Sequence, residues 1–322
     1  QSLVNLLTPA TAPTWKMLDD LPLPALDALP LETYWKLGIP HAGLLPKGKR
    51  FASIQTSRGC QDRCTFCHIS LEKERGEGFL QTFSKDYIQR YVDYAVSLGV
   101  QRLYFEDDNL FFSKKRLYDL HPILKREGLE YSNVNGGNLR FLFDKGEVDV
   151  PFIQMLADFG LVELMLPFES RSNQIMKQYA TGKYDPDKMD SVKLVRVLKD
   201  AGIRIQGNFM IGFEDEPWES VLSTKEYARQ LMAEGLDACG FMIPVPYPGS
   251  VDFRNRMRDP ELLRRFEADP LYFTDRMHWR LKPLFATEVP GERLVDAAQE
   301  FWAELNTKAY RTQKTNMNVA RS

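Results

Sequence analysis

Residues 52–68 read ASIQTSRGCQDRCTFCH: a short run with strand character leads directly into three cysteines within eight positions. The 322-residue chain has four cysteines in all, and the fourth, Cys239, lies far downstream in an apolar stretch. The crowding of Cys60, Cys64 and Cys67 therefore serves a local purpose. Ligand-type side chains that follow a strand directly are typical of the carboxyl edge of a parallel sheet, where α/β proteins bind their ligands.

The stretch opens a repeated pattern in which short β-rich runs alternate with longer amphipathic runs. The predicted strands are residues 52–56, 101–107, 131–135, 162–168, 203–211 and 238–243. A typical helix between them is predicted over residues 84–98, with Ser84 as its N-cap. A glycine separates helix from strand at five equivalent junctions, as the left-handed residue after a helix requires: Gly99, Gly128, Gly160, Gly202 and Gly235.

Six strands joined by right-handed helical crossovers predict an α/β fold with a parallel sheet. From the residues alone, the sheet is either doubly wound or curled into a partial barrel. Both architectures bind ligands at the carboxyl ends of the strands, so both place the cysteines at the functional edge.

The flanking regions differ from this α/β domain, which we assign to residues 51–250. Residues 1–50 hold seven prolines and predict a semi-extended linker with short helical turns at most. Its Leu and Trp residues indicate that it packs on a neighbouring surface. After residue 250 the alternation stops, and residues 251–322 predict a C-terminal helical extension that helps to shape a substrate pocket.

Composition excludes several classes of protein. The net charge of −2 and the pI near 6.2 give no general polyanion-binding surface, which argues against a nucleic-acid partner. No apolar run approaches the roughly 20 residues of a membrane span, and the first residues lack the layout of a signal peptide. Few cysteines in a long chain suit a reducing compartment, so we expect a cytoplasmic protein.

Three chemistries compete for the clustered cysteines. A structural zinc site requires a fourth ligand, normally from a second close pair, and His68 is poorly placed for it. A redox CxxC is present as Cys64–Cys67 but leaves Cys60 without a role. An iron–sulfur cluster uses thiolates, and three local thiolates would leave one iron open for chemistry.

The motif CxxxCxxC after the first strand, with Phe66 before the last cysteine, resembles the radical S-adenosylmethionine superfamily. The strings TSRGCQDRCTFC, FEDDNL and LDDLPLPALDALPLETY are similar to the branch that carries an N-terminal cobalamin-binding domain. The resemblance implies a partial (β/α)6 TIM-type barrel. It also implies that Cys60, Cys64 and Cys67 hold a 4Fe-4S cluster whose open iron binds S-adenosylmethionine.

The resemblance further implies contacts with S-adenosylmethionine at the strand ends. Acceptors after the second strand are expected near its ammonium group: Glu106, Asp107 and Asp108. Glu169 and Ser170 match a pair expected near the ribose or the methionine carboxylate. The next residue is Arg171 where the family commonly has glycine, and it either clamps a carboxylate or points to solvent.

The remaining expected contacts lie on the third and fifth strands. Asn208, Met210, Ile211 and Gly212 would line the adenine base, as the resemblance implies. Asn135 and Arg140 follow the third strand among glycines that permit close backbone approach, and Arg140 is a candidate for carboxylate or substrate binding. No catalytic side chain is assigned.

No cobalamin domain and no DxHxxG motif occur in the chain. Because the chain begins inside what resembles a linker, we expect that an upstream domain, of the cobalamin-binding type, is missing; the alternative is a protein that uses only the iron–sulfur half. The first functional hypothesis is cobalamin-dependent C-methylation of a small-molecule substrate through a 5′-deoxyadenosyl radical. The alternatives are a radical cyclisation, rearrangement, epimerisation or oxidation without methyl transfer, and a plain electron-transfer protein. An enzyme of this type requires an electron donor such as flavodoxin or ferredoxin.

Overall fold

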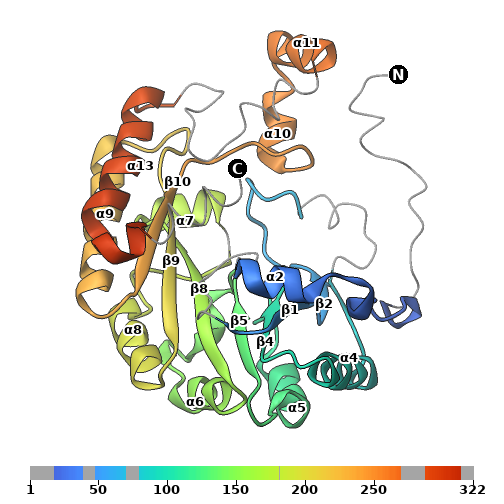
Figure 1. The fold of residues 1–322 in the computed structure, drawn as a ribbon. Coiled ribbons are helices and arrows are strands. Elements are labelled where there is room, and N and C mark those ends of the chain that lie inside the picture. Colours follow the sequence, from blue (N-terminus) through green and yellow to red (C-terminus); the bar gives the residue numbers. More distant parts are fainter. Residues whose placement is uncertain (1–17, 39–47, 70–79, 181, 270–286, 313–322) are drawn as a thin grey trace.

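A computed structural model of the protein describes residues 18–38, 48–69, 80–180, 182–269 and 287–312. Six parallel strands form one curved sheet (Figure 1), in the order β1 (Phe51–Ile54), β4 (Arg102–Phe105), β5 (Glu130–Asn133), β8 (Leu161–Glu169), β9 (Arg204–Met210) and β10 (Ala238–Met242). The order of the strands in this sheet is therefore their order along the chain. A doubly wound sheet reverses its strand order at a switch point, and this sheet does not. The partial-barrel prediction is confirmed.

The helices that follow the strands begin at polar caps. Seven of them have a Ser or Asp side chain that accepts a hydrogen bond from the first turn, and Ser84 is one of them, as predicted. The five junction glycines all have positive φ angles, between 73° and 112°. The helices between and after the strands are α4 (Lys85–Ser97), α5 (Lys114–Leu124), α6 (Val150–Asp158), α7 (Asn173–Tyr179), α8 (Ser191–Asp200) and α9 (Trp218–Ala233).

Stacked rings in the core join the last three strands. Phe209 of β9 stacks on Phe168 of β8 and on Phe241 of β10, with ring centroids 5.6 and 5.3 Å apart. Tyr227 of α9 meets Phe168 and Phe209 edge-on. Stacked and edge-on pairs add to the stabilisation that burial of the rings already gives, so this end of the sheet is rigid.

The described part of the linker packs on the domain, as predicted. It forms short helical turns, η1 (Leu18–Asp20) and η2 (Leu26–Ala28), and the seven-residue helix α2 (Leu31–Leu37). Leu18, Leu26 and Trp35 are buried, and the Trp35 indole donates to the Phe51 carbonyl across 2.8 Å. Residues 1–17 and 39–47 of the predicted linker lie outside the described residues.

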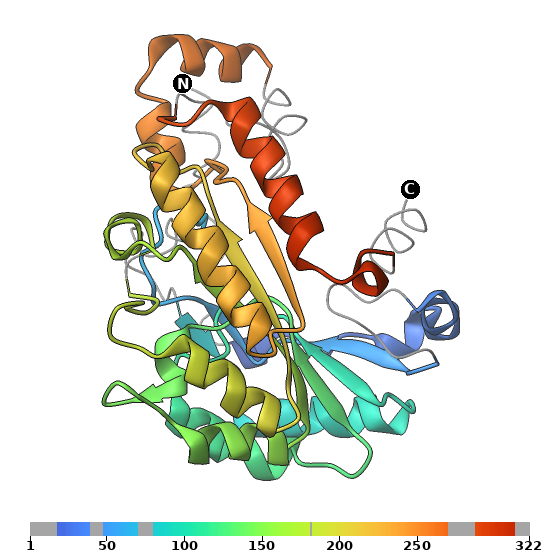
Figure 2. The ribbon, with the colours of Figure 1, turned by 90° about the vertical axis from the view of Figure 1, so that its left-hand side faces the viewer.

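Within the described residues, the helices after β10 include α10 (Val251–Arg256), α11 (Pro260–Ala268) and α13 (Gly291–Leu305). Figure 2 shows α13 beside α9 at the β10 end of the sheet, where Phe301 meets Phe241 edge-on at 5.3 Å. Residues 270–286 and 313–322 of the predicted extension are outside the described ranges, and the domain boundaries stay a prediction. None of the helices in the described ranges combines the length and apolarity that crossing a bilayer requires.

Candidate functional site

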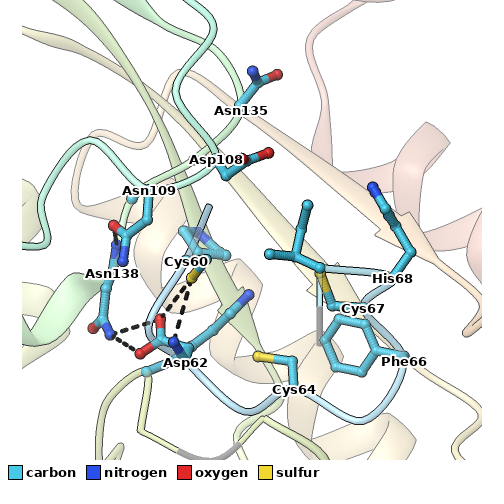
Figure 3. A pocket seen from close by; sticks show the side chains of 15 residues that line it. Cys60, Asp62, Cys64, Phe66, Cys67, His68, Asp108, Asn109, Asn135 and Asn138 are labelled. Carbon is cyan, nitrogen blue, oxygen red and sulfur yellow. Dashed lines mark hydrogen bonds between the residues drawn. The ribbon is translucent and has the colours of Figure 1, made fainter. Parts of the chain in front are cut away.

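The three clustered cysteines line one cavity at the carboxyl edge of the sheet (Figure 3). They follow the short strand β2 (Ser57–Gly59), which pairs with β3 (Leu80–Thr82) beside the main sheet. The cavity holds about 220 Å³. Its other walls come from the loop that carries the cysteines, from the ends of β4, β5 and β8, and from the segment after α7: Asp62, Phe66, His68, Ile69, Asp108, Asn109, Asn135, Gly136, Gly137, Asn138, Pro167 and Lys183.

Two aspartates at the end of β4 hold the start of the cysteine loop. Asp107 is fully buried, and its carboxylate accepts from the backbone N–H and hydroxyl of Thr56, at 3.1 and 2.7 Å, and from the hydroxyl of Ser57. Asp108 accepts from the backbone N–H of Gly59 at 2.7 Å. Burial raises the pKa of Asp107, while Arg116 and these hydrogen bonds act to lower it. The acidic pair thus fixes where the loop leaves the sheet.

Backbone hydrogen bonds to two helices hold the middle of the loop that carries the cysteines. The N–H of Thr65 donates to the carbonyl of Tyr179, at the end of α7, across 2.9 Å. The Thr65 carbonyl accepts from the N–H of Asp252 in α10 at 3.0 Å. Next to it, Phe66 meets Phe213 at 5.9 Å, and Phe213 stacks on Tyr179 at 4.6 Å. The position of the cysteines therefore depends on segments more than 100 residues away.

Cys60 is positioned by a polar cluster that the sequence motif did not reveal. The backbone N–H of Asp62 points to the Cys60 sulfur at 3.4 Å. The Asp62 carboxylate accepts both of its 2.9 Å hydrogen bonds from the Asn138 amide (Figure 3). It also lies 3.6 Å from Arg140. Arg140, predicted to bind a carboxylate, thus already has a carboxylate of the chain beside it.

Lys183 is the other functional candidate that the sequence analysis missed. Its ammonium forms a buried ion pair with Glu169 and lies 5.7 Å from the centre of the Phe66 ring. Burial alone would lower the pKa of Lys183, but the negative charge of Glu169 reverses this and raises it. A permanent cation therefore faces the cysteine cavity. Its sequence context, ATGKY, carries no signal that would single it out.

Glu169 closes β8 in the left-handed backbone region, with φ at 55°. A non-glycine residue in that region is strained by about 1 kcal/mol, and such strain clusters at functional sites. The conformation turns the carboxylate toward Lys183, while the next side chain, Ser170, is buried against Thr224 with their hydroxyls 3.2 Å apart. Arg171 pairs with Asp187 at 2.7 Å on the surface.

The structure separates the predicted contacts on β4 and β5. Asp108 and Asn135 line the cysteine cavity. Glu106 lines a different cavity and is joined to the first by a 3.2 Å hydrogen bond from the amide of Asn135.

The predicted adenine-contacting residues at the end of β9 do not line the cysteine cavity within the described part of the chain. Ile211 is fully buried in the main core, and Met210 packs with Tyr179 and Phe213. Gly212 has a φ of 89° and donates its N–H to Glu216 at 2.7 Å. Asn208 lies on β9 next to Gly240. Their predicted role stays a prediction.

Asn109 offers a free donor to the cavity. Its side chain is 2% exposed, and its oxygen accepts from the backbone N–H of Asn138 at 3.3 Å. Its amide nitrogen has no hydrogen-bond partner among the described residues. A buried donor without a partner is costly unless a ligand or water accepts from it, so this group points to a bound acceptor.

The thiols themselves fit a metal group better than an apolar core. Burial raises the pKa of Cys64 to about 12, which leaves it protonated at neutral pH unless a metal displaces the proton. None of the four cysteines forms a disulfide. Within the described residues, no three Cys, His, Asp or Glu side chains converge on one point as ligands of a single ion. Three thiols that line one cavity without converging on one point fit a multi-iron cluster better than a single metal ion.

Comparison with known proteins gives the same chemistry. The model of the Radical SAM superfamily matches residues 54–228. An uncharacterized methyltransferase of Pyrococcus horikoshii is 29% identical over 301 residues, which cover 92% of this chain and 56% of that protein. The cytidylyl-2-hydroxyethylphosphonate methyltransferase of Streptomyces wedmorensis is 22% identical, covering 92% of this chain and 54% of its own length.

Among solved structures, the radical S-adenosylmethionine methyltransferase TsrM of Kitasatospora setae, with cobalamin and a 4Fe-4S cluster bound, matches with a TM-score of 0.49 and 16% identity. The match covers 66% of this chain and 42% of that one. The chain spans about half the length of the curated relatives it matches.

Proposed function

The chain belongs to the radical SAM superfamily, and on this premise we propose that Cys60, Cys64 and Cys67 bind a 4Fe-4S cluster at which S-adenosylmethionine is cleaved reductively. The observation that carries the proposal is the composition of one cavity: three thiols, a buried cation and an unpartnered amide donor. When bound, the cluster would supply the electron that splits the sulfonium into methionine and a 5′-deoxyadenosyl radical.

The side chains of the cavity have separable tasks in this proposal. The three thiolates hold the iron, and Lys183 balances their negative charge together with that of Glu169. Asn109 offers its free amide N–H to the carboxylate of S-adenosylmethionine, and Asp108 and Asn135 offer acceptors to its ammonium. The resemblance also predicted contacts with S-adenosylmethionine from residues that do not line this cavity, and for them the role stays a prediction: Glu106, Asp107, Arg140, Glu169, Ser170, Arg171, Asn208, Met210, Ile211 and Gly212.

We further propose that the radical serves C-methylation of a small-molecule substrate, with cobalamin as a second cofactor and a flavodoxin or ferredoxin as electron donor in the cytoplasm. The support is that the relatives matched over most of this chain are named methyltransferases, among them a bacteriochlorophyllide d methyltransferase of Chlorobaculum tepidum. A radical cyclisation, rearrangement, epimerisation or oxidation is the alternative. Detection of cobalamin, or of a methylated product, in the full-length protein separates the two.

The first step is tested by anaerobic reconstitution with iron and sulfide, followed by S-adenosylmethionine and a reductant. We expect 5′-deoxyadenosine and methionine in equal amounts. Replacement of any one of Cys60, Cys64 and Cys67 by alanine should reduce both to background. A purified protein that holds zinc, or a cluster that leaves S-adenosylmethionine intact under reduction, would contradict the proposal.

A further inference from the structure

A second cavity lies between the linker and the first strand, and no part of the proposed cluster chemistry uses it. It holds about 660 Å³, within the usual range of roughly 300–1,000 Å³ for small-molecule sites. Its walls are the linker turns, the inner side of β1 and the first turns of α4. The linker is therefore part of a binding pocket and not only a connector.

The walls of this linker cavity present carbon surface. Leu21, Pro22 and Leu29 contribute from the linker. Opposite them are two tyrosine rings whose hydroxyls are already used: Tyr87 donates to the carbonyl of Pro22 at 3.0 Å, and Tyr91 donates to that of Ser53. With their polar tips bonded to the backbone, the rings contribute carbon surface to the wall, and Tyr87 is stacked on Phe83, which also lines the cavity, with ring centroids 4.4 Å apart. Surfaces of this kind favour a flat, ring-containing ligand.

One end of the cavity is charged. The Glu106 carboxylate accepts from the Ser53 hydroxyl at 2.9 Å and from the Asn135 amide at 3.2 Å, one bond to each oxygen. A carboxylate oxygen has two lone pairs, so each oxygen can accept a second hydrogen bond. No Lys or Arg in the described residues forms an ion pair with Glu106. A negative charge with spare acceptor capacity at the end of an apolar pocket favours a cationic group.

Glu106 also fixes where such a ligand would lie. Asn135, its hydrogen-bond partner, lines the cysteine cavity (Figure 3), so a group bound to Glu106 stands one side chain away from that cavity. We propose that the linker cavity binds the substrate: an apolar ring compound with an ammonium group, held by Glu106 beside the site of radical formation. The role as substrate site rests on the proposed function, whereas the binding itself does not.

The binding is tested by calorimetric titration of the anaerobically reconstituted protein with tryptamine and with indole-3-acetate, which share a ring and differ in the sign of their charge. We expect tryptamine to bind at least about ten-fold more tightly than indole-3-acetate, because Glu106 attracts one and repels the other. Glu106→Gln should remove most of this preference. Leu29→Lys, which places a cation at the mouth of the cavity, should weaken tryptamine binding about ten-fold.

Leu222→Lys is the matched control, because Leu222 on α9 is 43% exposed and Leu29 is 46% exposed. The control should bind tryptamine like the wild type. Absence of tryptamine binding by the wild type, equal affinity for the two compounds, or an equal loss in Leu29→Lys and Leu222→Lys overturns the proposal.

Failure of the site and failure of the proposed function give different results. Leu222→Lys should still form 5′-deoxyadenosine at the wild-type rate, because Leu222 lines neither cavity. If the wild-type protein binds tryptamine selectively but forms no 5′-deoxyadenosine, the result supports the linker cavity as a binding site and contradicts the proposed reaction. The Glu106→Gln variant also tests the prediction, made from the sequence, that Glu106 contacts the ammonium of S-adenosylmethionine. If Glu106 makes that contact, the variant should bind S-adenosylmethionine more weakly as well.

Discussion

Cys64 and Cys239 are both buried thiols, and burial raises the pKa of each to about 12. Their surroundings differ. Cys64 lines a cavity, and the cation of Lys183 lies close enough to act against the effect of burial. Cys239 sits inside β10, where the amide of Asn306 bonds its backbone N–H at 3.0 Å and its carbonyl at 2.9 Å. Burial alone gives an inert thiol, whereas the cavity and the cation beside Cys64 suit the role of metal ligand that we propose for it.

The largest difference between the two cysteines should appear in iron content. Cys64→Ala should bind no stable cluster after anaerobic reconstitution, because one of three thiolate ligands is lost. Cys239→Ala should bind the wild-type amount of iron and lose about 1 kcal/mol of stability from the small cavity that it creates. Iron analysis and urea unfolding measure both effects. Equal iron content in the two variants would break the comparison.

Loss of the cation beside Cys64 should have the next largest effect. Lys183→Met leaves the buried charge of Glu169 without a partner and should lower the free energy of unfolding by about 3 kcal/mol. The double variant Lys183→Met/Glu169→Gln should recover most of this loss. Urea unfolding of the single and double variants at pH 7 measures it.

Lys125→Met is the control, because the pair of Lys125 and Asp158 is about half exposed and should contribute little to stability. A similar small loss in Lys183→Met would show that the buried pair is not ionised as described.

Removal of the side-chain amide of Asn138 or of Asn306 should have a smaller effect than loss of the Lys183 cation. Asn138→Ala and Asn306→Ala each remove buried hydrogen bonds and should each lower the free energy of unfolding by about 2 kcal/mol. Only Asn138→Ala should also reduce iron bound per folded protein, because Asn138 holds Asp62 beside Cys60. A loss of iron in Asn306→Ala would remove the distinction between the two regions.

Much of the fold could be predicted because its signals are local. The strands have compact apolar runs, Ser84 caps its helix, and Gly160 takes a φ of 100° where a helix ends. The cysteine loop could be predicted because its three thiols lie within eight positions, so no knowledge of the tertiary structure is required to bring them together. These features follow from residues that are neighbours in the sequence.

The rest of the site depends on tertiary pairing. Asp62 meets Asn138 across 76 positions, and Lys183 reaches the cysteines only because the segment after α7 returns to the same edge. Glu106 and Asp107 were predicted to act together, yet successive side chains at a strand end point to opposite faces. This alternation would have predicted different surroundings for the two side chains. Asp107 is buried under the loop, and Glu106 faces the linker cavity.

The tie between Thr65 and Tyr179 has a consequence for the maturation of the protein. During synthesis the cysteines leave the ribosome more than 100 residues before the helix end that fixes their loop. Until that helix is made, the thiols are exposed and able to bind the wrong metal or to oxidise. If the three thiols hold the proposed cluster, their loop reaches its final position only after at least the first four strands of the sheet have been translated, so iron supplied earlier would find the ligands not yet arranged.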